Sequence, residues 1–514
     1  MLVKTFASAV HGVQAHTITI EVNMTSGGTE MKSFIVGLPD NAVKEAWQRI
    51  ETAISHNGFR IPRKKYVFNL APADIRKEGS GYDLPMAIGL LACTGNIPDT
   101  HLKDYLIMGE LSLDGQIQPV KGALPIAIQA RKEGFKSFIL PEQNAREAAI
   151  VDNLDVLGVT HLNQVVDHLM DIKKIEPVHI NTRDEFMHHL GQHDVDFSDV
   201  KGQENIKRAL EIAAAGGHNV ILIGPPGAGK TMLAKRMPTI LPPLTLHEAL
   251  ETTKIHSVAG KLGHGASLMY NRPFRSPHHT VSDVALVGGG NNPQPGEISL
   301  AHNGVLFLDE LPEFRRNALE VLRQPMEERK VTISRARFSV DYPANFMLIA
   351  SMNPCPCGYY NHPEKDCVCG PGVVQRYLNK ISGPLLDRID LHVEVTPVAI
   401  EELTAVKEEE KSASIRDRVI RAREIQEHRY ASGSYGSNAL LPSSAVREWC
   451  RIDQPGQMLL NKAMERLGLS ARAYDRILKV ARTIADLADA SDIRIEHLAE
   501  AIQFRSLDRE NWAG

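Results

Sequence analysis

The stretch "ILIGPPGAGKT", Ile221 to Thr231, decides the fold of the middle of this chain. From Gly224 onward it matches the pattern G-x-x-x-x-G-K-[ST]. An apolar run precedes the glycines and the helix-like run "TMLAKRMPTIL" follows them, so the match lies between a predicted strand and a predicted helix. Glycines let backbone N–H groups surround phosphate oxygens, and a helix N-terminus adds partial positive charge. The stretch therefore predicts a nucleotide-binding α/β domain.

The predicted phosphate loop assigns a task to two of its side chains. Lys230 is expected to reach the β- and γ-phosphates of ATP, and the Thr231 hydroxyl is expected to bind Mg²⁺. The full set of candidate nucleotide-binding residues in the loop is Gly224, Pro225, Pro226, Gly227, Ala228, Gly229, Lys230 and Thr231. The alternative is a Gly/Pro turn that matches by chance, and it leaves the strand–helix setting unexplained.

Two carboxylates follow a second apolar strand, "GVLFLDE", Gly304 to Glu310. Ligands of open parallel sheets lie at the carboxyl ends of the strands. Asp309 is therefore expected to bind Mg²⁺, and Glu310 is expected to polarise the attacking water. Asn353 ends the next apolar strand, "FMLIASMN", where its amide is placed to hold that water or the γ-phosphate. The alternatives are solvated acids at a strand end and an asparagine that caps a turn.

Length and composition predict a multidomain protein of ordinary globular type, and the strand–helix alternation makes its class α/β. The chain has 514 residues, of which 43% are hydrophobic and 23% charged. No apolar run approaches the ~20 residues of a membrane helix, and the start lacks the pattern of a signal peptide. Because the cysteines do not suggest an extracellular disulfide framework either, a cytoplasmic protein without membrane contact is expected. The net charge of −4 confines any nucleic-acid contact to local basic patches.

Changes of pattern along the chain predict four segments. Residues 1–171 mix strand-like runs such as "HTITIEVNM" with helices, as an α+β domain does. Residues 172–196 are polar with little periodicity and resemble a linker. Residues 197–396 alternate strands and helices, which is typical of a parallel sheet, and residues 397–514 are helical and predict a bundle.

Four of the six cysteines lie within fifteen residues, in "NPCPCGYYNHPEKDCVCGP". They are Cys355, Cys357, Cys367 and Cys369. Two C-x-C pairs separated by nine residues are not the usual zinc spacing. A loop this polar has little core of its own, however, and four bonds to Zn²⁺ would order it. The interpretations are a structural Zn²⁺ site, a redox or disulfide role, and simple packing.

At the level of whole motifs the chain resembles a known family. The stretches that carry the resemblance are "DVKGQENIKRALEIAAAGGHNVILIGPPGAGKT", "RPFRSPHHTVSDVALVGGGNNPQPGEISLAHNGVLFLDELPEF", "SMNPCPCGYY", "RYLNKISGPLLDRIDLHVEV" and "LSARAYDRILKVARTIADL". They are similar to AAA+ ATPases of the magnesium-chelatase-like branch, and most of all to the competence protein ComM family, also called YifB. The resemblance covers nearly the whole chain, including the N-terminal domain and the cysteine cluster.

The resemblance implies a ring, usually a hexamer, with ATP bound between subunits. It places an arginine finger at Arg388, with Arg376 as a second candidate, and a sensor arginine of a helical lid at Arg472. A finger reaches a neighbour's γ-phosphate and stabilises charge in the transition state. The alternatives are a surface ion pair of Arg388 with a nearby aspartate and an ordinary helix-surface role for Arg472. Weaker nominations, for an adenine pocket, are Val200, Gly202 and His218.

Two insertions resemble features that touch DNA in related helicase rings. One is "SDVALVGGGNNPQPGEI" and the other is "EERKVTISRARFSVDYPAN", which reads as a β-hairpin before the Asn353 strand. Residues 315–337 carry seven Arg or Lys against three Glu, a local charge of +4. The candidate phosphate contacts are Lys330, Arg335 and Arg337. The alternative is a solvated hairpin with ordinary surface charge.

The N-terminal domain resembles the proteolytic domain of Lon, which uses a Ser–Lys dyad. In "EGSGYD" Gly81 occupies the place of the nucleophile, and Ser80 comes one residue early. In "PVKGALPI" Leu124 occupies the place of the base, and Lys121 comes three residues early. We therefore expect a retained fold without peptidase activity, which serves as a structural, DNA-contacting or ring-stacking module.

These features predict an ATPase that uses ATP and Mg²⁺, with Zn²⁺ as a further candidate metal. By resemblance, it would be a hexameric DNA motor, a ComM-like helicase that promotes branch migration in natural transformation and recombination. The alternatives are a magnesium-chelatase-type ATPase subunit, an ATP-dependent Lon-like protease and a non-enzymatic DNA-binding scaffold. The Lon-like domain and the cysteine cluster weigh against a chelatase subunit. The displaced dyad weighs against a protease. The intact ATPase residues weigh against a non-enzymatic scaffold.

Overall fold

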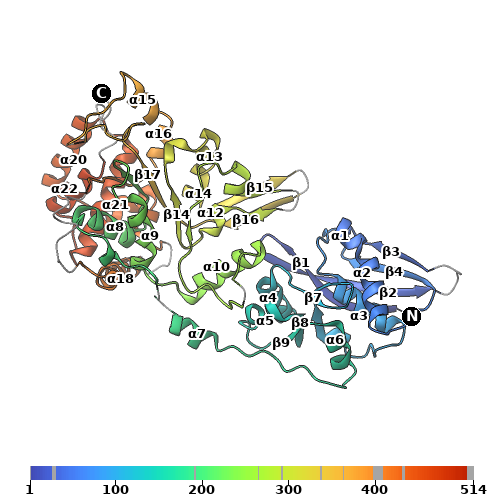
Figure 1. Ribbon diagram of the computed structural model, residues 1–514. Helices are drawn as coiled ribbons and strands as arrows, with labels where there is room; N and C mark the ends of the chain where they lie inside the picture. The colour runs from blue at the N-terminus through green and yellow to red at the C-terminus, as the bar shows by residue number, and fades with distance from the viewer. Residues whose placement is uncertain are drawn as a thin grey trace. The chain divides into compact units, whose positions relative to one another are not determined.

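A computed structural model describes residues 2–25, 31–189, 191, 193–263, 265–290, 293–335, 338–362, 364–397, 409–430 and 435–505 (Figure 1). The chain folds into two compact units. The first comprises Met1–His189 and Leu246–Tyr270, and the second comprises Leu190–Thr245 and Asn271–Gly514. The segment expected to be a linker, 172–196, contains a helix, and residues 246–270 belong to the first unit although the phosphate loop precedes them.

The first unit is built on a mixed seven-stranded sheet with the order β3-β4-β2-β1-β5-β8-β9. Strands β1, β2 and β4 pair antiparallel, and the remaining pairs are parallel. The bounds are β1 (Leu2–His11), β2 (Gln14–Thr25), β3 (Lys32–Val36), β4 (Lys65–Ala71), β5 (Tyr105–Ile107), β8 (Ser137–Pro141) and β9 (Asp155–Val159), with a small hairpin of β6 (Glu110–Leu111) and β7 (Ile117–Gln118). The expected mixture of strands and helices in this domain is confirmed.

Helices cover this sheet where the sequence carries apolar runs or capping residues. Asp40 accepts a 2.8 Å hydrogen bond from the Val43 N–H and so begins the first helix. The α3 run is apolar on all sides because the helix is buried along its whole length. The helices are α1 (Asn41–Lys44), α2 (Ala46–His56), α3 (Asp83–Cys93), η1 (Leu102–Asp104), α4 (Ala123–Glu133), α5 (Glu142–Ala148), α6 (Leu162–Leu169), α7 (Thr182–His189) and α10 (Leu246–Ala259).

Helix α10 packs on α4, and two contacts fix the segment around it. The Gly122 N–H donates to the Ser257 carbonyl at 3.1 Å, and the Lys121 side chain lies against Gly260. From α7, Glu185 accepts hydrogen bonds from the Ser267 hydroxyl at 2.7 Å and from Tyr270. The chain that leaves the phosphate-loop helix is therefore tied into the first unit.

The second unit contains a parallel five-stranded sheet with the order β11-β14-β17-β10-β18, as the alternation of strands and helices predicts. The bounds are β10 (Val220–Ile223), β11 (Phe274–Arg275), β14 (Val305–Leu308), β17 (Met347–Met352) and β18 (Leu391–Glu394). Strands β10, β14 and β17 are wholly buried. Because β10 lies between β17 and β18, the phosphate loop leaves the sheet beside the end of the Asn353 strand.

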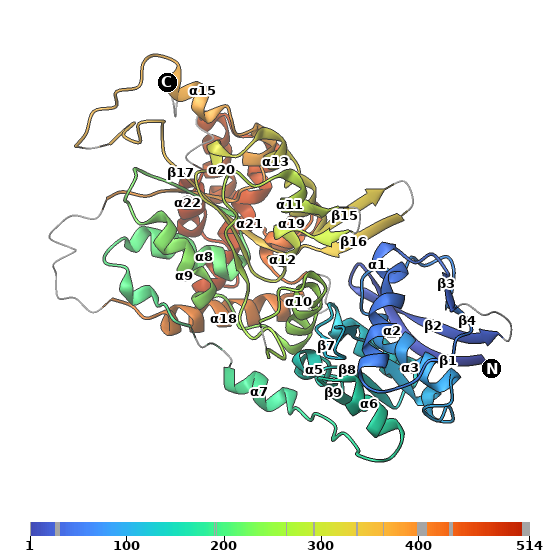
Figure 2. The same cartoon turned by 45° about the vertical axis from the view of Figure 1, so that its right-hand side comes forward.

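Helices and two hairpins complete this α/β layer. The helices are η2 (Phe197–Asp199), α8 (Glu204–Gly216), α9 (Lys230–Ile240), α11 (Asp283–Val287), α12 (Glu297–Leu300), η3 (Leu311–Glu313), α13 (Arg316–Glu320), α14 (Arg323–Glu328), α15 (Val373–Leu378) and α16 (Gly383–Leu386). The hairpins are β12 (Gly288–Gly289) with β13 (Gln294–Pro295) and β15 (Lys330–Arg335) with β16 (Phe338–Pro343). Figure 2 shows that β15 and β16 project from the unit on the side away from the C-terminal helices.

The C-terminal part of the second unit is helical, as expected. Its described elements are α18 (Ser412–Arg429), η4 (Asn438–Leu440), α19 (Ser443–Trp449), α20 (Gln454–Leu467), α21 (Ala471–Leu487) and α22 (Ile495–Gln503). Residues 397–408 were expected to belong to this helical part, but only residue 397 of them is described. One hydrophobic core joins the α/β layer to these helices, so the lid packs continuously on the nucleotide-binding layer.

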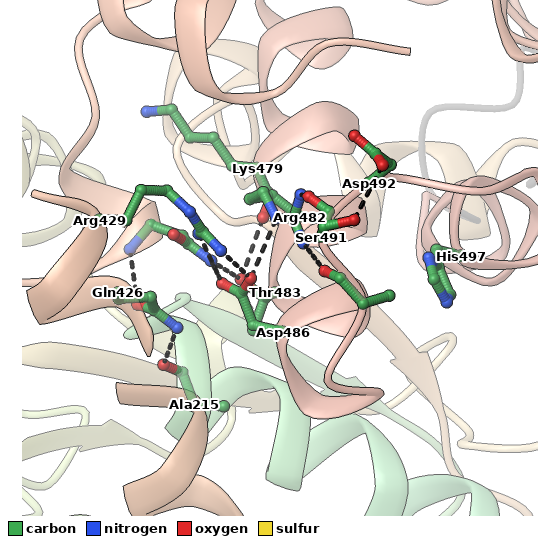
Figure 3. A network of polar contacts seen from close by, with 12 residues as sticks. Ala215, Gln426, Arg429, Lys479, Arg482, Thr483, Asp486, Ser491, Asp492 and His497 are labelled. Atoms are coloured by element: carbon green, nitrogen blue, oxygen red, sulfur yellow. Dashed lines mark hydrogen bonds and ion pairs between the residues drawn. The ribbon is translucent and has the colours of Figure 1, made fainter. Parts of the chain in front are cut away.

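A buried polar network fixes the lid helices to one another and to α8 (Figure 3). Arg429 and Arg482 both donate to the Asp486 carboxylate, which is 2% exposed, and Asn438 donates to it at 2.9 Å. Gln426 donates to the Ala215 carbonyl at 3.1 Å. Buried charges are tolerated when they are paired in this way, and the network gives the interface a defined geometry.

No helix within the described ranges combines the length and hydrophobicity that a membrane crossing requires.

Candidate nucleotide and metal sites

The phosphate loop joins the end of β10 to the start of α9, as the motif requires. Gly227 and Gly229 have φ angles of 79° and 85°, values that L side chains rarely adopt. A Cβ built on either residue meets no atom within 4 Å, so the space in front of the loop is open. Gly229 is the residue that directly precedes α9, and the helix N-terminus therefore faces this space.

Lys230 is buried and uses its three ammonium hydrogens inside the loop. Its Nζ donates to the carbonyls of Gly224 and Pro225 at 2.7 and 2.8 Å, and to Asn353 Oδ1 at 3.1 Å. Burial lowers the pKa of Lys230, and the charges of Asp309 and Glu310 oppose this effect. The contact brings Lys230 and Asn353 together as the sequence predicts.

The residues predicted to bind Mg²⁺ also lie together. The Thr231 hydroxyl donates to Asp309 Oδ2 at 2.7 Å. Asp309 Oδ1 accepts a hydrogen bond from the Ser351 hydroxyl, which lies on the buried strand β17. Sequence reasoning missed Ser351, although its position two residues before Asn353 gives it the same side of the strand. Hydroxyl and carboxylate oxygens are the ligands that Mg²⁺ prefers.

Glu310 stands beyond the end of β14 in a left-handed conformation, with a φ angle of 54°. This conformation is uncommon for residues other than glycine and turns the side chain away from the strand direction. Glu310 Oε2 lies 3.4 Å from His279 Nδ1, and the rings of His278 and His279 are 4.0 Å apart. The sequence alone leaves His279 open as a metal ligand, a hydrogen-bonded loop residue or a DNA contact. That His279 lies beside Glu310 can be recognised only when the fold is known.

The three candidate arginines contact groups other than the phosphate loop. Arg388 forms an ion pair with Glu327 at 2.5 Å, and Arg472 Nη1 lies 3.6 Å from Asp387 Oδ2. Arg376 is exposed on α15, and its Nε donates to the Gly372 carbonyl at 3.3 Å. A finger acts on a neighbouring subunit, so a single chain shows only the position from which it starts.

The three residues nominated for an adenine pocket have different surroundings in the structure. His218 is wholly buried, and its Nε2 is 2.8 Å from the Thr483 hydroxyl. Burial lowers the pKa of His218, which Asp390 partly opposes. The ring connects α21 to the α/β layer, and a role of His218 in an adenine pocket stays a prediction. Val200 is buried, and Gly202, two residues before α8, has a φ angle of 60°.

The four clustered cysteines converge although they come from two separate pairs. Their sulfur atoms all lie within 4.8 Å of one another, and all four residues are free thiols. Cys355 Sγ lies 3.3 Å from Cys357 Sγ and 3.7 Å from Cys367 Sγ. Four sulfurs around Zn²⁺ at ~2.3 Å would stand about 3.8 Å apart. The group thus has the donor set and nearly the spacing of a tetrahedral thiolate site.

The cysteine loop touches the phosphate loop. Gly358 is buried with a φ angle of 86°, and a Cβ built on it would come within 2.5 Å of Pro226 Cδ. A side chain at residue 358 would therefore collide with the phosphate loop, and glycine is required. This contact places the metal candidate directly beside the nucleotide site of the same chain.

The basic hairpin is only partly described. Lys330 forms a 3.1 Å ion pair with Asp341 across the two strands, and it remains about half exposed. The backbone of Arg335 pairs with that of Phe338, while Arg337 lies outside the described residues. Arg329, counted in the basic stretch, donates to the Phe346 carbonyl at 2.8 Å and so anchors the base of the hairpin.

The first unit does not assemble the Lon dyad. Ser80 donates its hydroxyl hydrogen to Glu110, whereas the exposed Lys121 lies along Gly260. A Ser nucleophile needs its base within hydrogen-bond reach. The arrangement therefore supports the prediction that the residues needed for peptidase chemistry are displaced.

Comparisons with known proteins agree with this geometry. Residues 196–403 match the family model described as "Magnesium chelatase, subunit ChlI", residues 20–144 match "Subunit ChlI of Mg-chelatase", and residues 409–505 match "Magnesium chelatase, subunit ChlI C-terminal". The competence protein ComM of Haemophilus influenzae is 43% identical over 509 residues, which cover 98% of this chain and 97% of that protein. This chain belongs to the ComM/YifB family of magnesium-chelatase-like AAA+ proteins.

Other ComM/YifB relatives match over a similar length. The protein YifB of Escherichia coli is 45% identical over 504 residues, which cover 98% of this chain and 96% of that protein. A protein of Mycobacterium tuberculosis described as uncharacterized is 39% identical over 503 residues, 98% of each chain. Lon protease 2 of Bacillus subtilis is similar over a part only, 30% identical over 189 residues that cover 31% of this chain and 33% of that protein. The expected family and the expected partial likeness to Lon are both confirmed.

Proposed function

We propose that the protein is an ATP-driven DNA motor, a hexameric ring that promotes branch migration in natural transformation and recombination. The observation that carries the proposal is the joint placement of Lys230, Thr231, Asp309 and Asn353 at one sheet edge, with Glu310 beside them. Lys230 would bind the β- and γ-phosphates, Thr231 and Asp309 would hold Mg²⁺, and Glu310 would orient the attacking water. Arg388 from a neighbouring subunit would supply positive charge to the transition state.

DNA as the partner is supported by the hairpin and by one relative. The β15–β16 hairpin projects from the second unit, and its sequence is basic (Figure 2). A related protein that matches nearly the full length is named competence protein ComM. Lys330, Arg335 and Arg337 are the proposed phosphate contacts, which would position the strand without reading its sequence. A motor of this kind would work in the cytoplasm, where the DNA and the ATP are.

We also propose that Cys355, Cys357, Cys367 and Cys369 hold one Zn²⁺. Thiolates are the form that binds the metal, and the four sulfur atoms lie close enough together for one ion to contact all of them. Bound Zn²⁺ would order the polar loop between Asn353 and Arg376, which lies against Pro226.

The proposal is tested by ATPase activity with and without forked or Holliday-junction DNA. We expect turnover that DNA stimulates in the wild type and that Lys230→Ala and Glu310→Gln abolish. Absence of both DNA stimulation and strand movement would contradict a motor that acts on DNA.

A chelatase motor is the second candidate, and the family models favour it. Three models that describe magnesium chelatase subunit ChlI together match most of the chain, including residues 20–144 of the first unit. Because a chelatase model also matches part of the first domain, the presence of this domain distinguishes the chain from chelatase subunits less clearly than the sequence pattern indicates. Adding a porphyrin and Mg²⁺ in place of DNA distinguishes the two functions, since only a chelatase motor would hydrolyse ATP faster with its partner subunits and porphyrin present.

A further inference from the structure

The candidate finger Arg388 is held inside its own chain. Its Nη1 donates to the Pro384 carbonyl at 2.6 Å, and its Nη2 lies 2.5 Å from Glu327 Oε1. Only 10% of the side chain is exposed. A finger must extend into the neighbour's site to reach its γ-phosphate. The observed conformer is therefore a retracted one.

The backbone beneath Arg388 is fixed, so extension has to come from the side chain. The Asn219 amide donates to the Arg388 carbonyl at 3.1 Å, and the Asn219 N–H donates to Asp390 Oδ2 at 3.0 Å. The Leu348 N–H in turn donates to Asn219 Oδ1 at 2.8 Å. These bonds attach the finger segment to β10 and β17, the strands that carry the phosphate loop and Asn353. Rotation about the Arg388 side-chain bonds then decides whether the guanidinium points inward or outward.

The guanidinium of Arg388 is held in the retracted position, but one of its N–H groups lacks an acceptor in the part of the chain that is described. Its Nε is buried and has no hydrogen-bond partner among the residues that the structure describes. A buried donor without an acceptor is unfavourable, and phosphate oxygens would satisfy the planar fork better. Glu327 is 57% exposed, so water weakens its attraction for Arg388. An outside anion can therefore displace this ion pair.

Glu327 lies on the element that leads into the hairpin. Helix α14 ends at Glu328, Arg329 follows with a φ angle of 55°, and β15 begins at Lys330. Arg329 Nη1 fixes this junction through its hydrogen bond to the Phe346 carbonyl. Glu327, which holds the finger, and the proposed DNA contact Lys330 are thus three positions apart in the chain.

We propose that Glu327 is a positioning residue that retains Arg388 in its own subunit until DNA binds the β15–β16 hairpin. This inference rests on the proposed function, in which the hairpin contacts DNA and Arg388 serves the neighbouring ATP. DNA phosphates that engage Lys330 shift α14 and weaken the contact between Glu327 and Arg388. The freed guanidinium then completes the neighbouring site, so that hydrolysis depends on DNA.

The test compares Glu327→Gln with Glu328→Gln, the adjacent glutamate on α14, which accepts a hydrogen bond from Gln324 instead. Steady-state ATP turnover is measured with and without a forked DNA, in the wild-type and in the Arg388→Ala background. Without DNA, Glu327→Gln is expected to raise kcat about twofold to fivefold, the range of an exposed ion pair, and to leave KM unchanged. With saturating DNA it is expected to match the wild type, and Glu328→Gln is expected to match it under both conditions.

Epistasis separates a retained finger from a general effect on the fold. In the Arg388→Ala background, Glu327→Gln is expected to have no effect, because no finger remains to be released. Unchanged basal turnover in Glu327→Gln overturns the inference, and so does a rise that persists without Arg388. A wild type that DNA does not stimulate overturns this inference, and the proposed function falls with it if no strand movement is seen either. A stimulated wild type with an unresponsive Glu327→Gln overturns this inference alone.

Discussion

Thr231 in the phosphate loop and Asp309 after the end of β14 are joined directly by a 2.7 Å hydrogen bond, although β17 separates β14 from β10 in the sheet. Lys230 likewise binds Asn353 and two carbonyls of its own loop. The groups that would hold Mg²⁺ and phosphate thus satisfy one another before the ligand arrives. Binding of Mg²⁺ and ATP exchanges these internal contacts for contacts to the ligand and leaves no buried polar group unpaired.

If ATP and Mg²⁺ replace these internal contacts, substitutions of Lys230 and Glu310 are expected to differ: the first lowers ATP affinity and the second lowers turnover. Lys230→Ala removes the cation that would contact the phosphates, so ATP affinity is expected to fall. Glu310→Gln keeps every contact of the loop and removes only the base, so ATP is expected to bind normally while turnover falls by roughly 10²–10⁴. Equilibrium binding of a fluorescent ATP analogue and steady-state turnover check both expectations. Normal turnover in Glu310→Gln would show that another group activates the water.

The buried His392 predicts that the free energy of unfolding decreases in mild acid. His392 is 1% exposed, and neither ring nitrogen has a partner in the described part of the chain. Burial, followed by the nearby Arg505 charge, holds the pKa of His392 well below 6.5. The unfolded chain therefore binds more protons, and stability must fall as the pH drops through 6.5. Between pH 7.5 and 5.5 this group is expected to lower the free energy of unfolding by on the order of 1 kcal/mol.

Urea unfolding at the two pH values measures this loss. His392→Leu removes the titrating ring and is expected to reduce the pH dependence by on the order of 1 kcal/mol. His247→Gln is the control, because the His247 side chain is 79% exposed and its substitution should leave the dependence unchanged. Equal pH dependence in wild type and His392→Leu would mean that His392 does not titrate as its burial requires.

The cysteine cluster predicts one zinc ion per chain. Cys357→Ser combined with Cys367→Ser removes a ligand from each C-x-C pair, and metal analysis of the purified variant is expected to show loss of the zinc. Cys450→Ala is the control, since that buried thiol lies outside the cluster and its loss should leave the zinc in place. Less than about half an equivalent of zinc in the wild type would count against the site.

If the metal is bound, it should also affect the nucleotide site. Removal by a chelator is expected to weaken ATP binding at a temperature where the fold is intact, because the loop contacts Pro226 through Gly358. Circular dichroism monitors the fold while ATP binding is measured. Unchanged binding after complete removal would restrict the metal to a role in local order.

The hairpin predicts a salt-dependent loss of DNA affinity. Lys330→Ala and Arg335→Ala are each expected to lower affinity on any sequence and to reduce the slope of log K against log salt by about 1. Lys462→Ala, at an exposed position on α20, is the control with the same change of charge. An unchanged slope in the hairpin variants would place the DNA contact elsewhere.

Sequence patterns predicted those parts of the fold that depend on neighbours along the chain. The phosphate loop, the two strands that carry Asp309 and Asn353, and the β15–β16 hairpin each carry a local pattern, so all of them are where the sequence indicates. The cysteines also converge as the metal hypothesis requires. In these places local propensity and the global fold agree.

Contacts between distant segments could not be read in the same way. The pairing of Glu310 with His279, and of Arg388 with Glu327, depends on which strands lie side by side and leaves no periodic signal. The surroundings of His218 are likewise set by α21, which follows it by more than 250 residues. The place of α10 in the first unit could not be predicted for a similar reason. Its packing partner α4 lies before the phosphate loop in the chain, whereas α10 lies after it.

Branch migration of a Holliday junction in real time tests the central claim most directly. The wild type with ATP is expected to move the branch point and release the product strands, whereas Glu310→Gln with ATP is expected to bind the junction without moving it. The rate of branch movement and the rate of ATP hydrolysis are expected to rise together with ATP concentration. Hydrolysis that proceeds on the junction without any movement of the branch point would contradict the proposed DNA motor.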